Sequence, residues 1–78
     1  MEEQIGYAAS NQKISKILAV LDSKGPMDSK TLAKTTRIVG ADKSIEELLE
    51  RKLVKLDGNK YALTDQGIQV NHKLRGVR

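Results

Sequence analysis

The chain has 78 residues, 38% hydrophobic and 31% charged, which is typical of one small globular domain and excludes a second domain or a disordered chain. It has no cysteine, a single histidine and no Phe or Trp, so disulfides, thiolate or histidine metal sites and an aromatic core are excluded, and no cofactor is expected. The formal net charge of +4 modestly favours polyanionic partners.

Residues 1–10 contain Ile5 and Tyr7 but no sustained hydrophobic period. We therefore expect an N-terminal arm that is either frayed or leans on the domain. Its first four residues are acidic where a secretion signal would be basic. No apolar run approaches the roughly 18 residues that span a bilayer, so a cytoplasmic location without a membrane partner is expected.

Two helices are predicted next. Asn11 is a suitable N-cap, and apolar residues then recur at i, i+3, i+4 and i+7, which is one face of a helix that ends near residues 24–25: Ile14, Ile17, Leu18 and Leu21. Pro26 stops this helix. Asp28 then caps a short second helix over about residues 29–36, which is expected to bury Leu32 and Ala33.

Residues 37–41 break the helical pattern, with Ile38 and Val39 expected to point inward and Gly40 expected at a sharp turn. A third helix follows. Its apolar face consists of Ile45, Leu48 and Leu49, and it gives way to a strand at Leu53.

A short β-hairpin is predicted around Asp57-Gly58-Asn59, whose residues supply the positive φ angles of a tight turn. Val54 and Leu56 on its first strand are expected to face Tyr61 and Leu63 on the second.

A last helix is predicted from Asp65 to about Arg75. Thr64 is its N-cap, and Gly67 allows it to lie close to another element. The apolar surface of this helix is wider than one contact requires, since Ile68 lies on one side and Val70 on another. We expect that spare side to be covered by a second chain, in a homodimer that includes the N-terminal arm, or by the arm of the same chain. Residues 76–78 form a basic tail.

This order of elements, with residues 50–56 before the hairpin and the Leu-Thr-x-x-Gly of residues 63–67 after it, resembles the small winged helix-turn-helix regulators of bacteria and archaea. The similarity covers residues 11–75. It implies an α+β, mostly helical domain with three helices, a hairpin wing and a C-terminal helix. Lys52 stands where members of this family commonly have glycine.

The resemblance implies double-stranded DNA as the partner and transcription regulation as the function. In this family the second helix crosses the DNA backbone, the third enters the major groove by its N-terminal half, and the wing contacts phosphates or the minor groove. The residues that match these roles are Lys30, Lys34, Thr35, Thr36 and Arg37 on or after the second helix, Lys43, Ser44 and Glu47 on the third, and Lys55, Asn59 and Lys60 in the wing.

Each of these residues also has an ordinary structural interpretation. The lysines can form a solvated face, the threonines can cap or turn the chain, and Asn59 can simply satisfy the turn. The third helix also carries an outward acidic group of Glu46, Glu47 and Glu50. The alternative function is therefore a protein-protein interaction module that docks a basic partner through this helix. No nucleophile and base stand together in a pattern typical of an enzyme.

Overall fold

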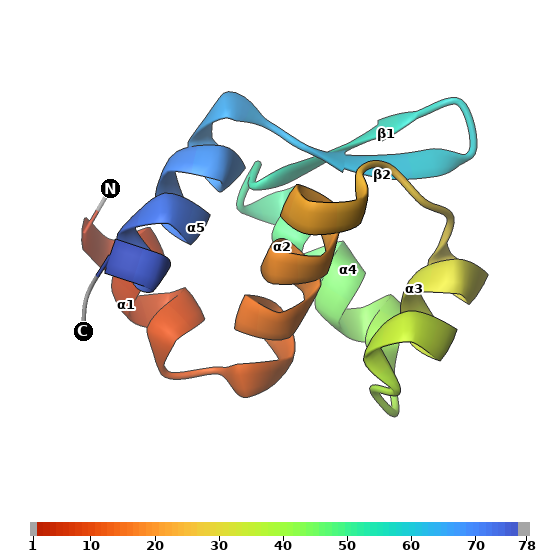
Figure 1. Cartoon of the computed structure of the whole chain (residues 1–78), viewed down its shortest axis with the longest axis horizontal. Coiled ribbons are helices and arrows are strands. Elements are labelled where there is room, and N and C mark those ends of the chain that lie inside the picture. The colour runs from red at the N-terminus through yellow and green to blue at the C-terminus, as the bar shows by residue number, and fades with distance from the viewer. Residues whose placement is uncertain (1, 77–78) are drawn as a thin grey trace.

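The computed structural model describes residues 2–76, which form an α+β, mostly helical fold with one antiparallel hairpin (Figure 1). The elements are α1 (Glu2–Ala9), α2 (Gln12–Lys24), α3 (Ser29–Thr36), α4 (Ala41–Glu50), β1 (Val54–Asp57), β2 (Lys60–Leu63) and α5 (Asp65–Gly76). This confirms the predicted fold class and is consistent with a winged helix. Within these residues no helix is both long and apolar enough to cross a membrane.

Helix α2 lies at the centre of the fold and packs against the four other helices and β2. Its start is fixed by the side chain of Asn11, which accepts hydrogen bonds from the backbone N–H groups of Lys13 and Ile14. The four apolar residues predicted from their spacing are all buried: Ile14, Ile17, Leu18 and Leu21. The core is therefore an aliphatic cluster around one amphipathic helix, as the composition predicts.

Helix α3 begins at the predicted cap, since the Asp28 carboxylate accepts the Thr31 N–H at 2.8 Å. Just before it, Met27 exchanges two backbone hydrogen bonds with Tyr61 of β2, at 3.1 and 2.9 Å. The entry to α3 is thus attached to the hairpin.

The hairpin has the predicted register, with Val54 opposite Leu63 and Leu56 opposite Tyr61. Asp57 pairs with Lys60, so the turn consists of two residues. Gly58 occupies its first position with φ of 67°, where a side chain would be strained.

The hairpin leads directly into α5 through Thr64. The Thr64 hydroxyl donates to the carbonyl oxygen of Lys52 at 2.7 Å and accepts the N–H of Gly67 at 3.0 Å. At Gly67 the backbone lies so close to Leu53 that a Cβ atom would overlap the Leu53 carbonyl oxygen. Both predictions for this segment, a Thr64 cap and close packing at Gly67, are confirmed.

The N-terminal arm is a helix, which its sequence pattern does not predict. Ala8 is fully buried, and α1 packs against both α2 and α5 (Figure 1). Of the two expectations for the arm, fraying is wrong and contact with the domain is correct. One side of α5 is therefore covered by α1 of the same chain. This is the alternative in which the arm, and not a second chain, covers the last helix.

Two smaller expectations also need adjustment. Val39 does not point inward: it is 86% exposed, whereas its neighbour Ile38 packs against the core. The basic tail expected at residues 76–78 begins inside α5, which runs through Gly76, and residues 77 and 78 lie outside the described part of the chain.

Replacing Gly67 with alanine is expected to lower the free energy of unfolding by about 1–3 kcal/mol, because the new methyl group must displace the Leu53 backbone. The control is Gly6→Ala in α1, where nothing lies within 4 Å of the added Cβ atom. That variant is expected to gain up to about 1 kcal/mol of helix propensity. Urea unfolding of both variants measures the difference, and equal stabilities would contradict the close approach.

Candidate nucleic-acid interface

Helix α3 and the turn after it carry positive charge only. Residues 29–40 include Lys30, Lys34 and Arg37 and no acidic residue. All three side chains are exposed. Lys30 and Lys34 stand four residues apart, so they project from the same side of the helix. The segment itself contains no carboxylate that offsets these charges, and Asp28 stands directly before it.

The hairpin adds further basic groups next to α3. Lys55 and Lys60 are exposed on its two strands, and Asn59 is exposed at its tip. Hydrogen bonds from Thr31 hold the pKa of Asp28 below its usual range, and the ammonium groups of Lys30 and Lys60 lower it further. Lys60 precedes Tyr61, whose backbone pairs with that of Met27 beside Asp28, so this end of the hairpin lies next to the start of α3.

Helix α4 has the opposite charge. Lys43 is exposed in its first turn, but the helix also carries four carboxylates, those of Asp42, Glu46, Glu47 and Glu50. The prediction that Ser44 faces a binding partner is wrong. Ser44 is only 7% exposed and lies on the buried side of the helix with Ile45.

The prediction that Thr36 contacts phosphate is also wrong. Thr36 is 1% exposed, and its hydroxyl donates to the carbonyl oxygen of Leu32 at 2.6 Å, so it is not a surface donor. Eight of the predicted residues remain on the surface: Lys30, Lys34, Thr35, Arg37, Lys43, Lys55, Asn59 and Lys60.

Glu47 belongs to a cluster that joins α1 to α4, which we call the Tyr7 cluster (Gln4, Tyr7, Glu47 and Arg51). The Tyr7 hydroxyl donates to the Glu47 carboxylate at 2.9 Å. The Arg51 guanidinium stacks over the Tyr7 ring, 3.6 Å from its centre, and Arg51 exchanges two hydrogen bonds with Gln4. Glu47 is half-buried, and one of its oxygens is bonded to Tyr7.

The Tyr7 cluster is not among the sequence predictions, because these assign no helix to residues 1–10. One signal was available: Gln4, Tyr7 and Ala8 stand at i, i+3 and i+4, the spacing of one helix face.

Comparisons of this chain with protein-family models, with curated proteins and with solved structures give no match. The resemblance to winged helix regulators therefore stays a prediction, and the function has to be inferred from the surface itself.

The Tyr7 cluster predicts a change in stability at high pH. Burial, and then the hydrogen bond to Glu47, raise the pKa of Tyr7 from 10.0 to about 12. Because the folded pKa is the higher one, this stabilisation is complete below pH 10 and is lost as the pH rises from about 10 to about 12. The difference in tyrosinate absorbance between the wild type and Tyr7→Phe should titrate near 12, and a midpoint near 10 would contradict the contact.

Proposed function

We propose that this protein binds double-stranded DNA in the cytoplasm as a small transcription regulator, with α3 and the hairpin on the phosphate backbone. The observation that supports this best is the backbone pairing of Met27 with Tyr61, which joins the start of α3 to the hairpin and so places exposed Lys30 and exposed Lys60 on adjoining segments. A row of phosphates is a partner that can neutralise such a surface over its whole length.

The phosphate contacts in this proposal come from the two elements that Met27 and Tyr61 hold together. Lys30, Lys34 and Arg37 extend from α3 and its C-terminal cap, and Lys55 and Lys60 extend from the strands. The exposed Thr35 hydroxyl is a further donor for a phosphate oxygen. Such contacts position a protein on DNA and make its affinity depend on salt, but they do not read sequence.

Fewer residues can recognise DNA bases than the amino-acid sequence predicts. Ser44 and Thr36 are buried, and Glu47 is engaged by Tyr7. Lys43 at the start of α4 and Asn59 at the hairpin tip remain to reach base edges.

The binding unit in this proposal is a single chain. The homodimer expected from the sequence needed a free apolar side of α5, and α1 packs against α5 within the chain. Among the described residues of α5, only Ile68 is a large exposed hydrophobic side chain, at 39%. Light scattering during the DNA titrations checks whether the protein has the mass of a single chain.

Replacing Lys34 or Lys60 with alanine is expected to weaken binding to any duplex. The slope of log K against log salt should fall by about one for each phosphate that the variant no longer binds. The measurement is titration of a fluorescent mixed-sequence duplex at two salt concentrations, with unlabelled competitor. Lys73→Ala is the matched control, because Lys73 is exposed on α5, and Figure 1 shows α5 and α3 at opposite ends of the molecule. No binding at low salt, or equal weakening by all three variants, would contradict the proposal.

The acidic side of α4 favours a second candidate function, docking of a basic protein partner, since Glu46 and Glu50 are exposed. Reversing one charge decides between the two. If α4 approaches DNA, Glu46→Lys is expected to raise affinity for the duplex several-fold more than Glu3→Lys, which makes the same change in charge at an exposed glutamate on α1. Equal effects in the duplex titration would place α4 away from DNA and favour a protein partner for its acidic side.

A further inference from the structure

Val39 is the most exposed large hydrophobic side chain among the described residues, at 86%. It lies in the turn between α3 and α4, which Figure 1 shows at the end of α3 that is farther from the hairpin. A single exposed apolar residue is common on protein surfaces. Val39 differs from that ordinary case because its backbone is held in place and its neighbours are cations.

The backbone of this turn is held from three sides. Arg37 and Gly40 have left-handed φ angles of 55° and 76°, and Ile38 between them packs against the core. The Lys13 ammonium group of α2 donates a hydrogen bond to the Val39 carbonyl oxygen at 3.3 Å. The turn therefore presents Val39 outward in a defined position, which reduces the entropy that is lost when a partner binds it.

Positive charge surrounds the Val39 side chain. Arg37 precedes it by two residues and Lys43 follows it by four, and both are exposed. Lys13 adds a third cation through its contact with the turn. Asp42 is the only carboxylate in residues 29–45, so the cations outnumber it. An apolar group among cations fits a partner that has both negative charge and an apolar group.

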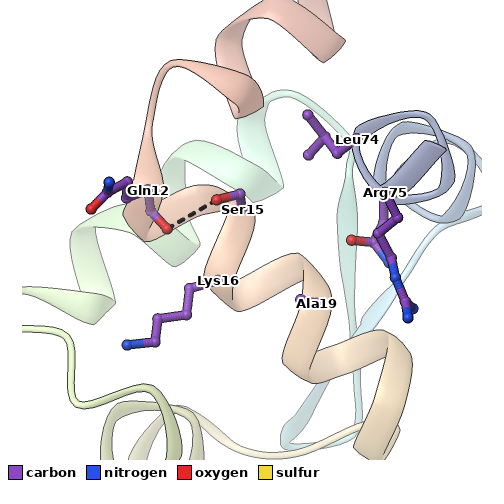
Figure 2. A pocket seen from close by; sticks show the side chains of 7 residues that line it. Gln12, Ser15, Lys16, Ala19, Leu74 and Arg75 are labelled. Carbon is purple, nitrogen blue, oxygen red and sulfur yellow. Dashed lines mark hydrogen bonds between the residues drawn. The ribbon is translucent and has the colours of Figure 1, made fainter. Parts of the chain in front are cut away.

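Lys16 continues the positive charge along α2. It stands three residues after Lys13, so the two lysines project from the same side of the helix. Lys16 lines a pocket of about 440 Å³ between α2 and α5, and Figure 2 shows its side chain extending away from Arg75, to the opposite side of that pocket. The charge of Lys16 therefore belongs with that of Lys13, and not with that of α5.

We propose that Val39 contacts the C5-methyl group of thymine in the major groove of DNA. This methyl group is the apolar group that base edges present there, and Val39 offers two methyl groups of its own. Arg37 and Lys13 lie beside it to meet phosphates, and Lys43 in the first turn of α4 reaches base edges in the same groove. The inference rests on the proposed DNA binding and names one base contact within it.

The test compares two duplexes of alternating adenine and thymine, in one of which deoxyuridine replaces thymine and so removes the methyl group. The wild type is expected to bind the thymine duplex about fourfold more tightly, which is the gain from burying one methyl group. Val39→Ala is expected to bind both duplexes nearly equally and to keep the wild-type melting temperature, because the side chain is exposed. Ile68→Ala is the control, since Ile68 is exposed on α5, and it is expected to keep the wild-type ratio.

The outcomes separate this contact from the DNA binding on which it rests. Equal thymine-to-deoxyuridine affinity ratios in the wild type and Val39→Ala overturn the contact while binding to both duplexes continues. An equal loss of the ratio in Ile68→Ala also overturns it. No binding of the wild type to either duplex at low salt overturns the proposed function itself, and the contact with it.

A second readout checks that the turn lies on DNA. Lys13→Gln is expected to lower the slope of log K against log salt by about one, because Lys13 is held beside the turn. Lys73→Gln, at an exposed lysine of α5, is expected to leave the slope unchanged. Equal slopes in these two variants overturn the placement of Val39 in the groove.

Discussion

The backbone of Leu53 fixes the relative positions of α4, the hairpin and α5. Its N–H donates to the Leu48 carbonyl at 2.9 Å, and its carbonyl oxygen accepts the Thr64 N–H at 3.1 Å. Gly67 lies against the same carbonyl group. Because the Leu53 side chain is also fully buried, these short-range contacts are anchored in the core. The direction in which the hairpin leaves the domain is therefore set by one residue and its three neighbours.

A second attachment, between Met27 and Tyr61, holds the hairpin against the start of α3. With both ends of β2 fixed, one at Tyr61 and one at Thr64, the strand has little freedom to move relative to the helices. The pairing of Met27 with Tyr61 places Lys60 next to the segment that leads into α3, where Lys30 stands. The convergence of positive charge that motivates the proposed function is thus a consequence of backbone pairing, and the Asp28 carboxylate lies where it partly offsets the repulsion between the two lysines.

Most of the fold could be predicted from the sequence because three of the four predicted helices start at a residue whose side chain can cap them; α4 starts after Gly40 without a side-chain cap. Asn11, Asp28 and Thr64 cap their helices as expected, and the turn residues determine the hairpin register. Helix α1 could not be predicted in this way. It is eight residues long with a glycine in its interior, so it depends on packing of Ala8 and on the Tyr7 cluster, which involve residues far along the chain.

The candidate site was less predictable, and the two errors have one cause. Thr36 stands four residues after buried Leu32, and Ser44 stands four residues before buried Leu48. Both polar residues therefore lie on the inward side of their helices, a placement that the 3.6-residue period contained. The resemblance assigns DNA contacts to Thr36 and Ser44 by their position along each helix, whereas the side of the helix on which they lie is what buries them.

The most specific motif of the resemblance is explained by contacts within this chain. In the Leu-Thr-x-x-Gly of residues 63–67, the threonine closes the base of the hairpin and the glycine admits the Leu53 carbonyl. These contacts explain the motif without any partner, so the motif favours a fold rather than a function. What can favour a function is the placement of charge, which is basic on α3 and acidic on α4. Phosphates attract the first and repel the second, so the proposed contact with DNA rests on α3 and the hairpin, and the carboxylates of α4 oppose a close approach of that helix to the phosphate backbone.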